Sequence, residues 1–194
     1  DVRGECEEGV RLGRRAVELR DDDAQTIGVA GFVMAWLGGE VEAGLTFIER
    51  ALALNPNDAL VWQGSAWVRC YNGQHDLAVE HIERAARLSP VDPQTTQFQL
   101  VAAMAHYCAG RFDEAASCAE QALRRQPDLV PALISLARSC AMVGRLEDAR
   151  RAMGRALQLN PSIRYAHYEA GSVMRRRQDS DLLEKGMFLA GIPE

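Results

Sequence analysis

The sequence predicts an all-α protein: a right-handed superhelix of antiparallel helix pairs, closed by a C-terminal capping helix. Three observations predict this fold class. A segment running from glycine to proline occurs four times at constant length, the copies recur at a period near 34 residues, and no stretch shows a convincing strand pattern. The chain has 194 residues, enough for several such helix pairs.

Each copy of the segment begins with glycine, continues with polar or acidic residues and carries small residues at helical spacing before its proline. Because glycine permits turn conformations and proline ends a helix, each copy is predicted to be one helix between two turns. The glycine and the proline are 17 positions apart in all four copies, which are Gly39–Pro56, Gly73–Pro90, Gly110–Pro127 and Gly144–Pro161.

The spacing of the prolines sets the repeat. Pro56 and Pro90 are 34 residues apart, as are Pro127 and Pro161, and this period with two helices per unit is similar to the tetratricopeptide repeat. We therefore expect one solenoid domain over residues 1–194. Its parts are a half repeat at 5–23, repeats at about 24–56, 57–90, 96–127 and 128–161, and a cap at 162–194.

Individual elements follow from this register. Cys6–Arg20 is interpreted as the second helix of an incomplete repeat, so the natural protein is expected to extend upstream of Asp1. In the next helix, Gln25–Leu37, Gly31 occupies the small slot where two helices approach closely. Asp58 is predicted to cap a helix N-terminus.

Two segments depart from the regular pattern. The linker Val91–Thr95 is three residues longer than its counterparts, and its prolines predict a rigid kink. Near the C-terminus, Ser162 is predicted to cap a helix that continues to about Arg177. A final helix at about Asp181–Ala190 is expected to cover the last apolar face of the solenoid.

Composition limits the function classes. The net charge is −5, which argues against direct binding of nucleic acid, and no apolar run approaches the ~20 residues that a membrane helix needs. The five cysteines lack a CxxC pair and fall at apolar or small helical positions, as in reduced proteins. We expect a cytoplasmic protein.

A search for catalytic chemistry gives no enzyme prediction for this segment. The four histidines form no HExxH motif, and neither a phosphate-binding glycine loop nor a GxSxG nucleophile motif is present. Acidic pairs such as Asp113–Glu114 fit the first turns of helices, where they complement the helix dipole. We expect no cofactor, no metal and no catalytic residues.

Function is expected on the first helix of each repeat, since these helices line the concave groove of a superhelix. Aromatic residues, Met and Arg are frequent binding hot spots, and such a groove favours an apolar peptide, a helix or a neighbouring domain in cis. The alternative is that Trp36, Trp67 and Tyr71 only pack between repeats. The predicted groove residues are Phe32, Trp36, Gln63, Trp67, Tyr71, Gln97, Met104, Tyr107, Arg138, Met142, Tyr165 and Tyr168.

Some stretches are more specific than a generic repeat. SPVDPQ (Ser89–Gln94), AGRFDEA (Ala109–Ala115), the helix and turn at Pro131–Arg150 and the ending LAGIPE (Leu189–Glu194) stand out. Together they resemble the C-terminal tetratricopeptide region of bacterial class III adenylate/guanylate cyclase-like proteins and of some winged-helix regulators. This resemblance implies a regulatory, partner-binding module of a larger bacterial protein, and it transfers no catalytic residues.

The sequence therefore favours a non-catalytic protein–protein interaction module or scaffold. Two alternatives stay open: the regulatory half of a nucleotide cyclase or transcription regulator, and a homodimerisation module. Binding of chaperone C-terminal tails is disfavoured. Domains that bind such tails carry Lys, Asn and Arg at slots that are occupied here by Gly28, Phe32, Gln63 and Trp67.

Overall fold

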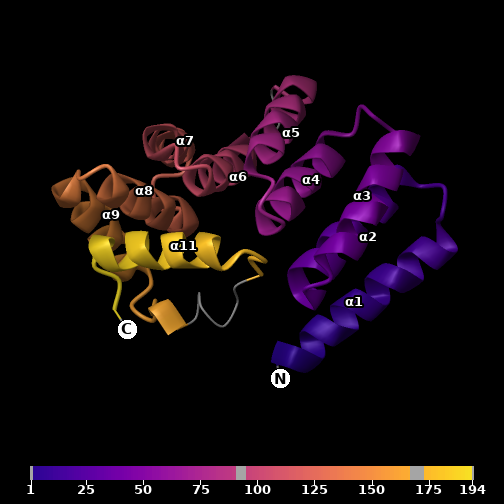
Figure 1. The fold of residues 1–194 in the computed structure, drawn as a ribbon, viewed down its shortest axis with the longest axis horizontal. Coiled ribbons are helices and arrows are strands. Elements are labelled where there is room, and N and C mark those ends of the chain that lie inside the picture. Colours follow the sequence, from indigo (N-terminus) through magenta and orange to yellow (C-terminus); the bar gives the residue numbers. More distant parts are fainter. Residues whose placement is uncertain (1, 91–94, 167–172, 194) are drawn as a thin grey trace. The chain divides into compact units, whose positions relative to one another are not determined.

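The computed structural model describes residues 2–90, 95–166 and 173–193, which form helices and no strand (Figure 1). The predicted all-α fold class is confirmed. The chain divides into two compact units, unit 1 at Asp1–Pro90 and unit 2 at Val91–Glu194. This boundary falls between the second and third repeats. The prediction of a single solenoid over residues 1–194 stays a prediction.

Unit 1 holds the half repeat and the first two repeats. Its helices are α1 (Val2–Leu19), α2 (Ala24–Gly38), α3 (Val41–Leu54), α4 (Ala59–Tyr71) and α5 (His75–Leu88). Each helix packs on its successor, and α2 also packs on α4. The first helices of consecutive repeats therefore lie side by side, as a tetratricopeptide register requires.

Unit 2 holds the third and fourth repeats and a C-terminal helix. Its helices are α6 (Thr95–Cys108), α7 (Phe112–Arg125), α8 (Val130–Met142), α9 (Leu146–Leu159) and α11 (Arg177–Ala190). The pairs α6–α7 and α8–α9 pack as helical hairpins, α7 packs on α8, and α6 reaches α8. An apolar cluster in this unit joins α8, α9 and α11 and includes Leu133, Met153 and Met187.

The turns inside the repeats confirm the predicted role of the glycines. The glycine that begins each of the four copies has a positive φ, between 65° at Gly39 and 85° at Gly144. L-residues with a side chain rarely adopt this left-handed conformation, which reverses the chain between the two helices of a repeat. The glycines that lie at a constant distance from the prolines in the sequence thus mark left-handed turns in the structure.

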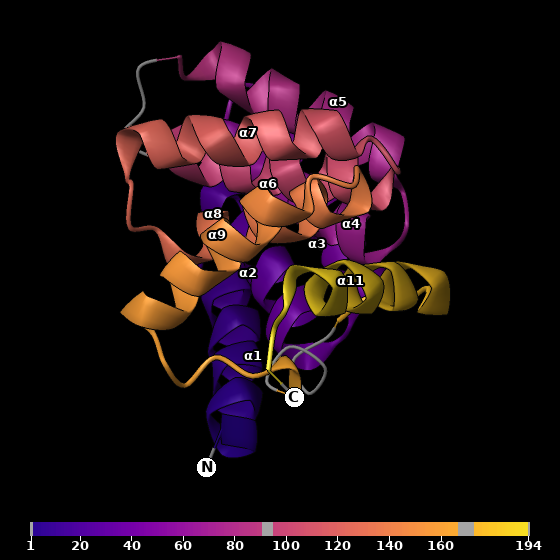
Figure 2. The ribbon, with the colours of Figure 1, turned by 90° about the vertical axis from the view of Figure 1, so that its left-hand side faces the viewer.

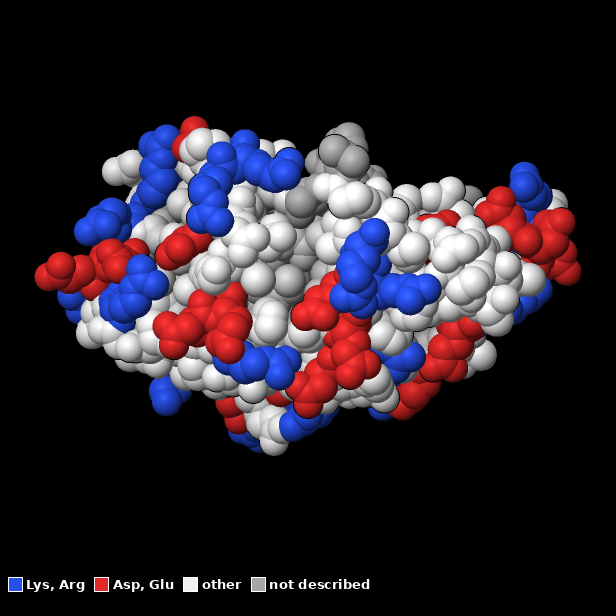
Figure 3. All heavy atoms as spheres, turned by 90° about the horizontal axis from the view of Figure 1, so that it is seen from above, with Lys and Arg blue, Asp and Glu red and all other residues white. Residues whose placement is uncertain are grey.

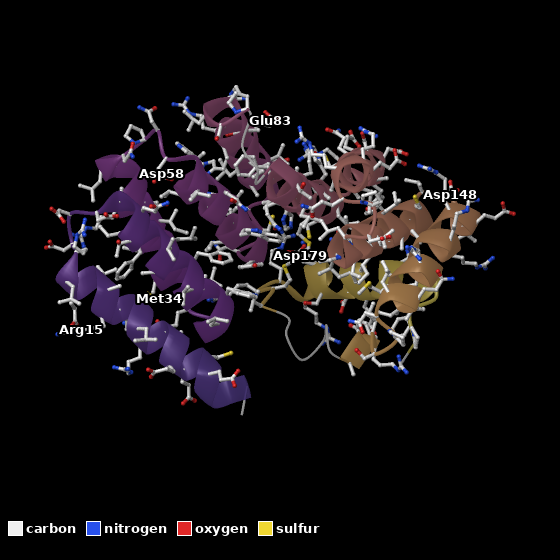
Figure 4. The ribbon with its side chains drawn as sticks, turned by 180° about the vertical axis from the view of Figure 1, so that it is seen from behind. Arg15, Met34, Asp58, Glu83, Asp148 and Asp179 are labelled. Carbon is white, nitrogen blue, oxygen red and sulfur yellow. The ribbon has the colours of Figure 1, made fainter. Side chains whose placement is uncertain are left out.

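Helix starts and helix crossings also follow the sequence. Asp58 lies at the start of α4 (Figure 4) and accepts hydrogen bonds from the backbone N–H groups of Leu60 and Val61, at 2.9 and 3.2 Å. The cap predicted at Asp58 is therefore confirmed. Gly31 lies where α2 crosses α3: a Cβ atom there would stand 2.6 Å from the carbonyl oxygen of Gly44.

The C-terminal segment differs from the prediction. Ser162 lies in a turn held by the Asn160 side chain, and the described residues 173–176 are not helical, so no continuous helix runs from Ser162 to Arg177. The final helix exists but begins at Arg177, four residues before the predicted start. Residues 91–94, most of the predicted rigid linker, lie outside the described residues.

Among the helices that the structure describes, none combines the length and the apolar character needed to cross a membrane.

Candidate functional site: the first-helix faces

We call the surface formed by α2 and α4 the first-helix face of unit 1. The two helices approach closely because small residues lie between them. A Cβ atom on Gly28 would meet the Val61 side chain at 2.7 Å, and one on Gly64 would lie 3.7 Å from the Cβ atom of Phe32. Side chains that flank these contacts on α2 and α4 are therefore brought onto one surface.

Two stacked aromatic pairs lie on these helices. The Phe32 and Trp36 rings are 5.6 Å apart between centroids, and the Trp67 and Tyr71 rings are 5.9 Å apart, each pair with an interplanar angle of 25°. Residues four positions apart on a helix lie one above the other, so each pair extends along its own helix. The sequence predicted all four as groove residues.

The exposure of these side chains differs. Trp36 keeps 50% of its surface exposed, whereas Phe32, Gln63 and Trp67 are half-buried. Tyr71 is buried, and this burial raises the pKa of its phenol above the ordinary value. Tyr71 is therefore closed to a partner, whereas Trp36, Phe32, Gln63 and Trp67 keep exposed surface that a partner can contact.

In unit 2 the corresponding face is covered. Tyr107 is completely buried and donates a hydrogen bond of 2.9 Å from its hydroxyl to the backbone oxygen of Leu182 in α11. Arg138 is 6% exposed, and its guanidinium carbon lies 4.8 Å from the centroid of the Tyr107 ring. These two predicted groove residues are therefore not open to a partner while α11 is in place.

The remaining predicted residues of unit 2 are distributed more widely. Met104 and Met142 are half-buried and pack, like Leu182 and Leu183 of α11, against the cluster that Tyr107, Cys108 and Ala115 form, and Gln97 is exposed. Tyr165 packs against Phe188 near the C-terminal end of α11, with ring centroids 4.8 Å apart and the rings tilted by 45°. Tyr168 lies outside the described residues.

Burial dominates the electrostatics beneath α11. It raises the pKa of the Tyr107 phenol to about 12, although the nearby Arg138 charge acts in the opposite direction. It also raises the pKa of the Cys108 thiol to about 12. Both groups are therefore neutral near pH 7 and add no charge to this part of the face.

Unit 1 contains a Ser–His contact that the sequence does not predict, because the two residues are 16 positions apart, on α4 and α5. Ser65 Oγ lies 2.8 Å from His81 Nδ1, and the imidazole packs edge-on against Trp62, with ring centroids 4.6 Å apart. Ser65 has no exposed surface, which denies a substrate access to its hydroxyl. The pair ties the two helices of the second repeat together.

His81 predicts a pH-dependent loss of stability. Burial, assisted by the Arg69 charge, lowers its pKa to about 4 in the folded chain, against about 6.5 in an unfolded one. The unfolded state therefore binds more protons between these values, and stability falls as the pH drops from 6.5 toward 4. We expect a loss of about 1–2 kcal/mol at pH 5 relative to pH 7, since the ring is partly solvated.

Urea unfolding followed by tryptophan fluorescence at the two pH values measures this loss. The variant His81→Gln removes the titrating group and should lose less stability between pH 7 and pH 5 than the unchanged chain. Equal losses in the two proteins would contradict the assignment of this pH dependence to His81.

The described surface carries charges of both signs. On the face drawn in Figure 3, Lys and Arg side chains are interspersed with Asp and Glu. Several form exposed ion pairs, such as Arg155–Asp128 at 2.7 Å. Within the described part of the chain, no group of three or more His, Cys, Asp or Glu side chains is placed to hold a metal ion. The stacked aromatic pairs remain the candidate binding feature.

These features define a helical-repeat protein whose first helices carry an aromatic face. Comparison with known families agrees: residues 64–129 match one family model described as a tetratricopeptide repeat, and residues 108–170 match a second with the same description. Together the matches cover residues 64–170, and this part of the chain consists of tetratricopeptide repeats. The tetratricopeptide prediction is confirmed.

One curated relative is a peroxisomal targeting signal receptor of Saccharomyces cerevisiae. It is 36% identical to this chain over 92 residues, a stretch that is 47% of this chain and 14% of the receptor. The chain thus spans only about one seventh of that protein.

Several solved structures have a similar fold. PilW, titled a type IV pilus biogenesis factor, has a TM-score of 0.75 at 16% identity, with 96% of this chain and 83% of that chain covered. For MamA from Desulfovibrio magneticus the TM-score is 0.61 at 20% identity, covering 82% and 88% of the two chains. YrrB, titled a TPR protein with an unusual peptide-binding site, gives 0.60 at 18%, covering 91% of each chain. At these identities the likeness shows the fold alone.

Proposed function

We propose that this chain is a non-catalytic protein-interaction module, and that the first-helix face of unit 1 binds a peptide or helix of a partner protein. The observation that carries the proposal is the pair of aromatic stacks on neighbouring helices, with Trp36 half exposed. Large aromatic side chains supply much of the binding energy in protein interfaces. When a partner covers an exposed tryptophan, apolar surface is removed from water, which favours binding.

The comparisons support this class of function. Tetratricopeptide solenoids present extended surfaces for partners, one relative is named as a receptor for a targeting signal, and one similar structure is titled for its peptide-binding site. The expected ligand is apolar, because the named side chains of the face are aromatic or uncharged.

Replacing Trp36 and Trp67 with alanine tests this proposal. Peptides are first selected against the unchanged chain from a displayed random library, and their dissociation constants are then measured by fluorescence anisotropy. We expect the double variant to bind at least tenfold more weakly, because tryptophan is enriched among the hot-spot residues whose truncation costs about 2 kcal/mol or more.

Leu54→Ala is the matched control. Leu54 is also 50% exposed, but it lies at the end of α3, a second helix, away from the proposed face. The control should bind the selected peptides like the unchanged chain. Peptides that bind the tryptophan variant normally, or that lose affinity for the Leu54 variant instead, would contradict the proposed site.

Two narrower proposals concern the parent protein and self-association. The resemblance around Ser89–Gln94 supports a regulatory region of a cyclase-like or winged-helix protein, and the coding sequence upstream of Asp1 tests it. Homodimerisation is tested by light scattering over a range of concentrations, where a strict monomer excludes it. Both stay predictions.

A further inference from the structure

A helix of the same chain covers the first-helix face of unit 2, which α6 and α8 form. The C-terminal helix α11 packs mainly against α8, less against α9, and reaches α6. Figures 1 and 2 show it on the side of α8 that is away from α7. A helix that merely continued the solenoid would pack closely on the preceding second helix, as α4 packs on α3 and α8 on α7.

The buried side of α11 follows a regular helical stripe. The stripe occupies positions i, i+3, i+4, i+7, i+8 and i+11, which lie on one side of a helix. Its members are the buried Asp179, Gly186, Met187 and Ala190 and the partly buried Leu182 and Leu183. Phe188 and Leu189 lie off the stripe and are exposed. A helix that packs on unit 2 in the same way needs an acidic residue, two leucines, a glycine and two further apolar residues at these six positions.

Gly186 is required for the close approach. A Cβ atom at this position would lie 2.0 Å from the Tyr107 hydroxyl oxygen and 3.2 Å from the Cβ atom of Arg138. Beside it, the same hydroxyl donates to the backbone oxygen of Leu182. The face thus contacts α11 through its backbone as well as its side chains, so Tyr107 selects a helix with no side chain at the crossing point.

Charged side chains lie at the N-terminal end of α11. Asp179, labelled in Figure 4, is 2% exposed, and its carboxylate lies 3.7 Å from the Arg176 guanidinium. Burial is the main cause of the raised pKa of the Cys108 thiol, and the charges of Arg138, Asp179 and Arg176 act on it as well. An acidic residue in the first turn of a helix also complements the helix dipole.

We propose that the first-helix face of unit 2 is a helix-binding surface, that α11 is its intramolecular occupant, and that an amphipathic helix carrying the same stripe displaces α11. This inference concerns a different face from the proposed function and does not depend on Trp36 or Trp67. A negative result on either face therefore leaves the other proposal standing.

The experiment uses the full chain and a fluorescent synthetic peptide of residues 177–192. In the unchanged chain, tethered α11 competes at a high effective concentration and should keep the peptide out. In the variant Gly186→Ala, the new methyl group clashes with Tyr107, so α11 leaves the face and the peptide binds at least tenfold more tightly. Fluorescence anisotropy measures both affinities.

Three controls make the result specific. Gly154→Ala, in α9, adds the same methyl group where no atom lies within 4 Å, and should exclude the peptide like the unchanged chain. A peptide with alanine at the position of Gly186 should not bind the Gly186→Ala variant. Adding Tyr107→Phe to Gly186→Ala removes the hydroxyl at 2.0 Å and leaves the ring carbon 3.1 Å from the new methyl group. A shift of a few tenths of an ångström relieves this contact, so α11 should return to the face and exclude the peptide again.

Two outcomes would overturn the inference. One is a Gly186→Ala chain that keeps its helical content but gains no affinity for the peptide, and the other is one whose unit 2 unfolds, because α11 would then be an integral part of the core. Hydrogen exchange on the unchanged chain tests independently whether α11 leaves the face. Amides of α11 should exchange at least tenfold faster than those of α8 and α9, and equal protection would count against a displaceable helix.

Discussion

Replacing Gly31 with alanine is expected to lower the free energy of unfolding of unit 1 by about 2–3 kcal/mol. The new Cβ atom would lie 2.6 Å from the carbonyl oxygen of Gly44 and 2.9 Å from the Cβ atom of Phe47, both fixed parts of α3. The two helices must separate to admit it. This cost exceeds the gain of about 1 kcal/mol that alanine brings over glycine inside a helix.

Urea unfolding followed by tryptophan fluorescence measures this loss, because all three tryptophans, Trp36, Trp62 and Trp67, belong to unit 1. Gly64→Ala is the matched control: its Cβ atom would lie 3.7 Å from that of Phe32, an ordinary contact. That substitution should be neutral or stabilising. If both variants gained stability, the close crossing of α2 and α3 would be wrong.

Truncating Tyr107 to alanine is expected to cost unit 2 about 3–5 kcal/mol. The ring is completely buried, packs edge-on against Phe112 with centroids 5.2 Å apart, and lies beneath the Arg138 guanidinium. Its removal leaves a cavity under α11 and takes away a favourable cation–π contact. Because unit 2 contains no tryptophan, the loss is followed by far-UV circular dichroism.

Tyr107→Phe separates the hydroxyl from the ring. It removes only the hydrogen bond to the Leu182 backbone and should cost about 1 kcal/mol. An alanine variant no less stable than the phenylalanine variant would show that the ring is not part of the folded core.

The sequence predicted the repeat register well because local chemistry determines it. A positive φ at Gly39 or Gly144 depends on the glycine itself, and the Asp58 cap depends on backbone groups two and three residues away. Such interactions lie within one turn of the chain, so they recur wherever the same residues recur.

The packing of α11 on the first helices α6 and α8 could not be predicted in the same way. Its contacts with Tyr107 and Arg138 join residues separated by tens of positions, and no local pattern distinguishes a helix that caps the last repeat from one that lies on the first helices. For this reason Tyr107 was predicted as a groove residue although it is buried. The spacing of Gly186, Met187 and Ala190 indicates which side of α11 is buried, but not which helices it packs on.

The aromatic residues of unit 1 show an intermediate case. The helical register predicted that Phe32, Trp36 and Trp67 share a face, and α2 and α4 do pack side by side. The register could not tell which rings stay exposed, because exposure depends on neighbours from other helices. Tyr71 is buried while Trp36 is half exposed, although each is the second member of an equivalent stack.

The left-handed turns have a consequence for the chirality of the backbone. At Gly110 and Gly144 φ is +77° and +85°, and a Cβ atom would meet nothing within 4 Å, so conformation rather than space excludes ordinary side chains. A D-amino acid prefers this mirror-image region of φ and ψ. A D-alanine introduced by chemical synthesis therefore fits either turn, and it would restrict the unfolded chain while leaving the folded one unchanged.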